Sequence, residues 1–303
     1  PYKLIDAIIF KKLRLNFGGR LQYFVGGGAL LDVELQKFFF SIGVPVFQGY
    51  GLTEASPTIS ANRPIKHRMG SSGQVLNHME LKIFDDKGNS LPAGEKGEII
   101  VKGENVMKCY YLNPESTAET IKNGWLHTGD MGYVDKDGYL YVLGRFKSLL
   151  IGGDGEKYSP EGIETSLVEK TRFIEQIMLY NNQNAYTTAI IVCNKEALKS
   201  YLRHNPNTEN NAERVLTLID SEISMFKSQG KFQGEFPERW LPSTFAIVEE
   251  PFTEENKMIN STLKMVRNKI VDAYKSRIDY MYTPEGKVIT NSQNVEIIKK
   301  MLS

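Results

Sequence analysis

The sequence predicts a mixed α/β protein, on three observations. Its length of 303 residues is enough for a sizeable buried core and suggests about two domains. Apolar runs alternate with glycine-rich loops and a helical pattern over residues 21–51, whereas residues 72–143 alternate like β-strands joined by tight turns. After Gly144, strand and helix patterns mix again, as in an α+β domain.

The composition is that of an ordinary globular protein and excludes several classes. Charged residues make up 24% and hydrophobic residues 41%, which argues against a disordered chain. The net charge of +1 gives no bulk attraction to nucleic acid, so we expect no nucleic-acid partner. Cys109 and Cys193 are too few and too far apart for a disulfide framework or a zinc site, so we expect a reducing, cytoplasmic location. The most apolar window, residues 38–47, is too short to span a bilayer.

The first 51 residues predict a helix followed by a strand–helix–strand unit. The chain opens without a methionine on a helical pattern, residues 4–15, so we expect it to be a piece of a longer protein. LQYFV (21–25) reads as a buried strand, a helix follows through 33–40, and VPVFQGYG (44–51) is a second buried strand. Such a unit implies parallel pairing, with ligands at the carboxyl ends of the strands.

The next region predicts antiparallel hairpins. ELKIF and EIIVK flank the turn residues 85–88, and GYVDKDGYLYVLG repeats the pattern around residues 135–138. A calcium loop is the alternative for the second turn. No acidic residue stands at the closing position after Asp135, so we predict a hairpin turn.

The last region predicts an α+β domain. Ser159-Pro160-Glu161 is a helix start, with the Ser159 oxygen as cap. Helix faces with buried apolar stripes and two apolar strands follow, and residues 205–213 read as a solvated insertion. We predict strands at 174–180 and 187–193, helices near 195–203 and 212–228, and a last helix with Val266, Ile270, Tyr274 and Ile278 on one face that closes the globular part.

Two glycine-rich segments could approach a ligand closely. In QGYGLTE (48–54), Tyr50 offers a flat face for a base, Thr53 a hydroxyl and Glu54 a hard oxygen for magnesium. Taken alone, this segment is equally well a polar exit from a strand. GGGAL (26–30) lacks the Lys-Ser/Thr pair of a Walker loop, so a tight turn is the default.

Four single residues carry further options. Asp130, at the end of GWLHTGD, suits a ribose diol but also suits an Asx turn. His127 has no partner that the sequence identifies, which favours a structural role. Arg145 could be a second ribose contact or a surface charge, and Lys264 stands in a polar loop where an exposed lysine usually serves solubility.

The order of these motifs is more specific than any one of them. QGYGLTE, GEIIVKGENVMKCYYLNPE (97–115), HTGD, GR-x-K and a terminal K-x-x-R follow one another as in the adenylate-forming superfamily, which the chain resembles over nearly its whole length. GRFKSLLIGGDGEKYSPEGIE (144–164) looks like the long-chain fatty acyl-CoA ligase version. Leu30 and Leu263 stand where the superfamily usually has proline and glycine, and residues 204–245 make the C-terminal part longer than usual.

The resemblance assigns a role to each matching residue. Thr53 would touch the α-phosphate, Glu54 would hold Mg²⁺, and Lys264 would be the mobile catalytic lysine. Lys147 falls at the interdomain hinge, and Gly155 where the pantetheine of CoA passes. The ribose hydroxyls would be bound by Asp130 and Arg145, and the adenine and acyl-adenylate pocket would be walled by Gly27, Gly28, Ala29, Gln48, Gly49, Tyr50 and Gly51.

The resemblance also implies an architecture and a reaction. Residues 1–71 would end an N-terminal α/β subdomain, 72–146 would form a β-barrel-like subdomain, and 147–303 a mobile α+β lid. The reaction would be ATP-dependent conversion of a long-chain fatty acid to acyl-AMP and then to its CoA thioester. The superfamily's phosphate loop would lie upstream of residue 1, so we expect the chain alone to be inactive. A non-catalytic nucleotide-binding module, an acyl-carrier-protein acceptor and a peripheral contact with the inner membrane face stay open, as does the oligomeric state.

Overall fold

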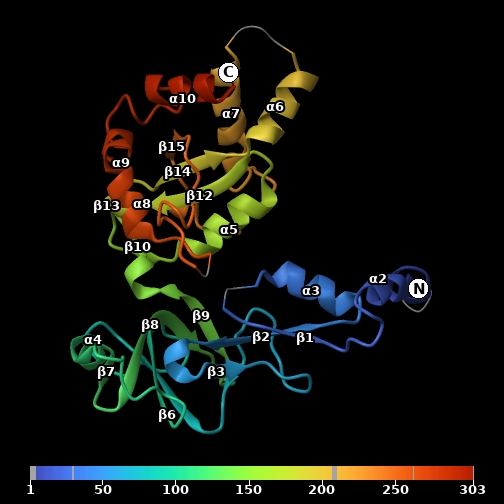
Figure 1. The fold of residues 1–303 in the computed structure, drawn as a ribbon, viewed down its shortest axis with the longest axis vertical. Helices are drawn as coiled ribbons and strands as arrows, with labels where there is room; N and C mark the ends of the chain where they lie inside the picture. Colours follow the sequence, from blue (N-terminus) through green and yellow to red (C-terminus); the bar gives the residue numbers. More distant parts are fainter. Residues whose placement is uncertain (1–4, 29–30, 207–209, 262, 303) are drawn as a thin grey trace. The chain divides into compact units, whose positions relative to one another are not determined.

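The computed structural model describes residues 5–28, 31–206, 210–261 and 263–302 (Figure 1). The chain forms two compact units, residues 1–147 and 148–303. The predicted combination of an α/β part, a β-rich part and an α+β part is confirmed. The division of the first unit near residue 71 stays a prediction.

The first sheet holds the predicted strand–helix–strand unit. Its strands run in the order β1-β2-β3-β4, with β1 and β2 parallel and the remaining neighbours antiparallel. The Asp32 side chain caps the connecting helix by accepting the Leu35 N–H at 2.9 Å. The elements are β1 (Phe24–Gly26), α3 (Val33–Ser41), β2 (Val46–Gly51), η2 (Thr53–Ala55), β3 (Thr58–Ala61) and β4 (Gln74–Val75).

The start of the chain is helical, as predicted, but its apolar residues are not buried. The segment forms a π-helical turn, η1 (Asp6–Phe10), and then α2 (Lys11–Asn16), and neither contains a buried residue. β1 ends the order of its sheet, and Val25 is 70% exposed. The prediction of a fully buried strand at 21–25 was therefore wrong: an apolar run does not distinguish an edge strand from a central one.

The second sheet of the first unit is antiparallel and carries the predicted hairpins. Its strands pair in the order β5-β6-β8-β7, and β9 pairs with β8. In the β8–β9 turn, the Asp135 carboxylate accepts the N–H groups of Asp137 and Tyr139, so the hairpin prediction is confirmed. Arg68 pairs with both acids of this turn. The elements are β5 (Met79–Phe84), β6 (Gly97–Gly103), α4 (Pro114–Thr120), β7 (Ile121–Lys122), β8 (Trp125–Val134) and β9 (Leu140–Arg145).

The second unit is built around a sheet that is buried on both faces. β12 (Ile174–Tyr180), β14 (Thr188–Cys193) and β15 (Thr244–Val248) lie in that order. β12 and β14 lie close to the predicted strand positions, whereas β15 was not predicted. One face of the sheet packs against α5, α6, α7 and α10, and the other against α8 and α9. Figure 1 shows these helices around the sheet. The helices are α5 (Glu161–Lys170), α6 (Lys195–His204), α7 (Asn211–Ser224), α8 (Arg267–Ala273), α9 (Lys275–Met281) and α10 (Ser292–Leu302).

Three predictions for the second unit were wrong. Ser159 does not cap α5; its hydroxyl is buried without a hydrogen-bond partner among the described residues, and the N-cap position is held by Pro160. The last predicted helix is two short ones, which break at Tyr274, although Ile270 and Ile278 are buried as expected. The globular part does not close there, because α10 adds the buried Ile298 to the core.

Short elements connect these parts. They are η3 (Phe146–Ser148), β10 (Leu150–Gly152), β11 (Lys157–Tyr158), β13 (Asn182–Asn184) and η4 (Glu238–Trp240). β10 pairs with β11 and with β13 in a small sheet of the second unit. None of the helices in the described ranges is long and apolar enough to cross a membrane.

Candidate functional site

The two predicted ribose-binding side chains face each other across a strand pair. Asp130 on β8 is paired in register with Arg145 on β9, and the Arg145 Nε lies 3.6 Å from the Asp130 Oδ1. The Tyr50 hydroxyl, from the end of β2, donates a hydrogen bond of 2.5 Å to the Asp130 Oδ2. Burial and the Asp130 carboxylate raise the pKa of Tyr50 well above its ordinary value, so the phenol stays a donor.

A second tyrosine–carboxylate pair stands beside this cluster. The Tyr110 hydroxyl donates to the Glu54 Oε1 at 2.8 Å, and the Glu54 carbonyl accepts the Met107 N–H at 2.7 Å. Burial, followed by Glu54, raises the pKa of Tyr110, while the charge of Arg145 acts in the opposite direction on both Tyr110 and Tyr50. Arg145 therefore lies within electrostatic reach of both tyrosines. Thr53 is exposed at the start of η2, next to Glu54.

The donor set fits a magnesium ion that arrives with a nucleotide. No group of three or more His, Cys, Asp or Glu side chains able to hold a metal occurs among the described residues. Mg²⁺ commonly takes one or two protein carboxylates and completes its shell with phosphate oxygens and water. Tyr110 engages one oxygen of Glu54, and the carboxylate is half-buried rather than sealed in the core. Such a site needs only one hard oxygen ligand from the protein, and Glu54 offers one.

The glycines of QGYGLTE are needed by the fold itself. A Cβ on Gly51 would stand 2.0 Å from the Pro57 carbonyl oxygen, and one on Gly49 would stand 2.9 Å from that of Ser60. The close approach of β3, with a bulge between Tyr50 and Gly51, is thus a structural reason for glycine at both positions. The sequence suggested close approach of a ligand instead; that role stays a prediction.

The remaining predicted wall residues lie at the neighbouring strand ends. Gly27 follows β1, and a Cβ there would stand 3.3 Å from the Gly49 carbonyl oxygen. Gly28 has φ +89°, which favours glycine. The Gln48 side chain is buried and accepts a hydrogen bond from Gln36 of α3 at 3.2 Å. Ala29 lies outside the described residues.

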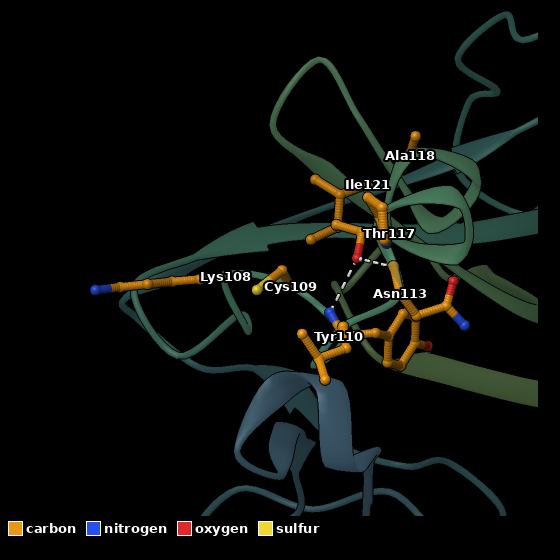
Figure 2. A pocket seen from close by; sticks show the side chains of 9 residues that line it. Lys108, Cys109, Tyr110, Asn113, Thr117, Ala118 and Ile121 are labelled. Carbon is orange, nitrogen blue, oxygen red and sulfur yellow. Dashed lines mark hydrogen bonds between the residues drawn. The ribbon is translucent and has the colours of Figure 1, made fainter.

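A pocket of about 440 Å³ borders the Tyr110–Glu54 pair (Figure 2). Tyr110 contributes to its wall, and its backbone N–H donates to the Thr117 hydroxyl at 3.0 Å, which in turn donates to the Asn113 carbonyl at 2.8 Å. None of the residues predicted for the site lines the pocket. It is lined by Lys108, Cys109, Tyr110, Leu112, Asn113, Pro114, Thr117, Ala118 and Ile121.

In the second unit, Lys264 stands on an exposed loop whose backbone is fixed. Its N–H donates to the Asn260 side chain at 2.9 Å, and its carbonyl accepts the Asn260 N–H at 2.9 Å. Leu263 has φ +59°, which gives a physical reason for the superfamily's usual glycine at this position. Arg267 anchors the loop's end by a two-pronged ion pair with Glu164 of α5, at 2.9 and 2.8 Å.

Gly155 and Lys147 lie at two backbone positions of interest. Gly155 has φ +83° in the turn between β10 and β11, with open space around it. Lys147 lies in η3 and is the last residue of the first unit. These placements leave the pantetheine and hinge roles of the two residues as predictions.

Two partners at the site escaped the sequence interpretation. His127 has a partner after all, since its Nδ1 lies 2.9 Å from the Glu98 Oε2 on the adjacent strand β6. Tyr110, the partner of Glu54, lies in the motif 97–115, but the sequence interpretation gave it no role. A hydroxylated aromatic residue in a motif otherwise rich in turn residues was the available signal.

Comparisons with known proteins give one consistent family. Residues 4–111 match the model of the AMP-binding enzyme family. The chain is 33% identical to the long-chain-fatty-acid–[acyl-carrier-protein] ligase AEE15, chloroplastic, of Arabidopsis thaliana, covering 93% of this chain and 38% of that protein. It is 27% identical to the long-chain-fatty-acid–CoA ligase FadD15 of Mycobacterium bovis, covering 94% and 46%. The chain thus spans less than half the length of these relatives.

The fold of this chain is also similar to that of a solved structure. The chain superposes on O-succinylbenzoate coenzyme A synthetase (MenE) from Bacillus subtilis in complex with AMP, with a TM-score of 0.61 and 26% identity. The match covers 85% of this chain and 49% of that chain. The same Bacillus enzyme has also been solved with ATP and a magnesium ion.

Proposed function

Because this chain belongs to the AMP-binding, adenylate-forming superfamily, we propose that it takes part in the ATP-dependent activation of a long-chain fatty acid and its transfer to CoA. The observation that carries the proposal is the Tyr50–Asp130–Arg145 cluster, in which a carboxylate and a guanidinium face each other on paired strands. A carboxylate can accept hydrogen bonds from two adjacent sugar hydroxyls, and a guanidinium supplies donors beside it.

The first half-reaction joins the fatty acid to AMP. A carboxylate oxygen of the acid bonds to the α-phosphorus of ATP, the bond to the bridging oxygen breaks, and pyrophosphate leaves with the electron pair. Asp130 and Arg145 hold the ribose, Thr53 contacts the α-phosphate, and the Lys264 ammonium neutralises charge that builds on the phosphate oxygens. Glu54 would hold Mg²⁺, which supplies further charge neutralisation when bound.

The second half-reaction passes the acyl group to a thiol. The sulfur bonds to the acyl carbonyl carbon, the bond from that carbon to the phosphate oxygen breaks, AMP leaves, and the thiol proton passes to solvent. Lys264 and the thiol need the same approach, so we propose that the second unit turns about Lys147 and presents Gly155 in place of the lysine. Binding of CoA or another acceptor is part of this proposal.

The acceptor is the least constrained part of the proposal. One relative is named for a carrier-protein acceptor and another for CoA. We propose CoA, and a holo-acyl-carrier protein is the rival. Supplying each acceptor to the acyl-adenylate and identifying the thioester by mass spectrometry separates the two.

Location and completeness belong to the same proposal. We propose a cytoplasmic protein, with peripheral contact to the inner face of the membrane as an open alternative. We also propose that catalysis needs more protein than these 303 residues, since they span less than half of the relatives. Fatty-acid-dependent ATP–pyrophosphate exchange by the 303-residue chain would contradict this.

Nucleotide binding by the chain itself tests the observation that carries the function. We expect AMP to bind in calorimetric titration and Asp130→Asn to weaken the affinity at least tenfold, because an amide is a poorer acceptor for the diol. Glu80→Gln, a carboxylate-to-amide change on the exposed side of β5, is the matched control and leaves affinity unchanged. Equal binding of AMP and 2′,3′-dideoxy-AMP would overturn the ribose assignment.

A non-catalytic nucleotide-binding module is the second candidate. It would use the same Asp130 and Arg145 cluster and would pass the binding test. It differs in that Lys264 would have no function, so the effect of Lys264→Ala on adenylation decides between the two.

A further inference from the structure

The glycine-rich loop between β10 and β11 is clamped by two residues that come more than 80 positions later. Arg239 donates through Nε and Nη2 to the two carboxylate oxygens of Glu156, at 2.7 and 2.9 Å. The Trp240 Nε1–H donates to the same carboxylate at 2.8 Å. Three donors on one carboxylate, two of them in the forked arrangement of an arginine, define the position of Glu156 at the end of the loop.

The clamp is tied to the buried core of the second unit. The Trp240 ring stacks on Tyr158, with centroids 5.1 Å apart and planes within 4°. Tyr158 is buried, and its hydroxyl shares a hydrogen bond with the buried Thr187, which directly precedes β14, the middle strand of the sheet. The contact therefore joins the loop to the packed core.

The clamping residues belong to residues 204–245, the stretch that makes the C-terminal part longer than is usual in the superfamily. η4, which carries both, ends a segment that packs along α5. Glu235 of that segment accepts hydrogen bonds from Ser166 and Lys170 of α5, at 2.7 and 2.6 Å. The Phe226 and Phe232 rings pack together at 5.0 Å. The segment thus holds the helix that follows the loop as well as the loop.

The contacts of Glu156 restrain a loop that is rich in glycine. Gly152, Gly153 and Gly155 give it a wide range of backbone conformations, and glycine loses more freedom on ordering than any other residue. Inside the loop, the Gly155 N–H donates to the Gly152 carbonyl, and the Gly152 N–H donates to the Glu156 carbonyl. The Glu156 N–H also donates to the Asp154 side chain at 3.0 Å, and Gly152 is paired with Asn184 of β13. The side chain of Glu156 adds further contacts to the rest of the unit.

We propose that Arg239 and Trp240 are positioning residues for acyl transfer. Through Glu156 they hold the glycine-rich loop in the conformation that lets the acceptor thiol pass. The inference rests on the proposed function and adds a role for the long C-terminal stretch.

Lys264 stands on a different loop, whose backbone is held by Asn260. The bonds to Glu156 are separate from those that join Glu235 and Arg267 to α5. We therefore expect loss of the clamp to slow the second half-reaction and to leave adenylation unchanged.

The test measures the two half-reactions separately in the whole enzyme that carries this chain. Trp240→Phe removes the N–H donor and keeps an aromatic ring on Tyr158, and Glu156→Gln weakens the acceptor. We expect transfer from preformed acyl-adenylate to CoA to slow at least tenfold, with ATP–pyrophosphate exchange within twofold of the parent. Glu238→Gln, a neighbouring carboxylate-to-amide change, is the control and alters neither rate.

Different outcomes overturn the clamp and the proposed function. Transfer at the parental rate, or an equal fall in both half-reactions, overturns the clamp. If the parent enzyme shows no exchange, the proposed function fails instead. The clamp is then judged by hydrogen exchange in the chain: amides of residues 152–156 must exchange faster in Trp240→Phe than in Glu238→Gln, and equal exchange overturns it.

Discussion

The cluster that would hold the sugar and the loop that carries Lys264 are built in opposite ways. Asp130 and Arg145 are placed by the register of two long strands, and Tyr50 reaches them from another sheet of the same unit. Lys264 is exposed on a loop held through Asn260, and in the described part of that loop the strand pairing is limited to one isolated bridge, between Ile259 and Met265. A strand pair organises its side chains before a ligand arrives, whereas the loop leaves its ammonium free to move.

The difference indicates where rigidity is required. A ribose site works on a ligand that stays in place, so it gains from preorganisation. A lysine that must come and go gains from a loop whose base is rigid and whose tip is free. Arg267 supplies that base, because its ion pair with Glu164 is nearly sealed, with exposed side-chain fractions of 16% and 5%. The predictions below test each half of this comparison.

The largest expected effect is on the rigid base of the lysine loop. Arg267→Met leaves the Glu164 carboxylate buried without its partner, and removing one member of a buried pair typically costs about 3–5 kcal/mol. We expect urea unfolding of the second unit to shift by about that free energy. Arg203→Met, on the exposed face of α6, should shift it by less than about 0.5 kcal/mol. Equal shifts in both variants would show that the pair does not anchor the loop.

The second-largest expected effect comes from replacing Lys264, at the tip of the same loop. Lys264→Ala should slow fatty-acid-dependent adenylation by the whole enzyme by about 10²–10³, the usual loss for one preplaced charge on the reacting groups. AMP affinity should stay at the parental value, because the proposed ribose contacts are those of Asp130 and Arg145. Lys269→Ala, an exposed lysine on α8, is the control. Unchanged turnover in Lys264→Ala would favour the non-catalytic binding module.

The comparison also explains which parts of the molecule the sequence could predict. The strands at 174–180 and 187–193 were found almost to the residue, because their apolar side chains fill both buried faces of the sheet, although Glu175 and Gln176 interrupt the apolar run of β12. β15 was not predicted, although all five of its residues are buried. α10 was missed because its polar and apolar residues resemble a tail unless the core surface that receives Ile298 is known. Ser159 had the right residue type for a cap, yet the helix started one residue later.

Long-range pairs at the site could not be predicted from the sequence. Glu98 and His127 meet across β6 and β8 beside a register shift, which no local pattern announces. The Tyr110–Glu54 pair joins two motifs that are 56 positions apart. Asp130 and Arg145 could be named because motif order identified them, but their contact with Tyr50 required the fold.

The smallest effect concerns the strained position beside Lys264. Leu263 has φ +59° and is 78% exposed, so its side chain contributes little burial while its backbone occupies a region that costs about 1–2 kcal/mol for residues other than glycine. Leu263→Gly relieves that cost and adds about 0.4–1 kcal/mol of unfolded-state entropy. Since the entropy opposes the relief of strain, we expect the free energy of unfolding, measured in urea, to rise by between about 0 and 1.6 kcal/mol. A loss of more than about 1 kcal/mol would mean that Leu263 makes a stabilising contact, and that the loop tip is less free than the comparison requires.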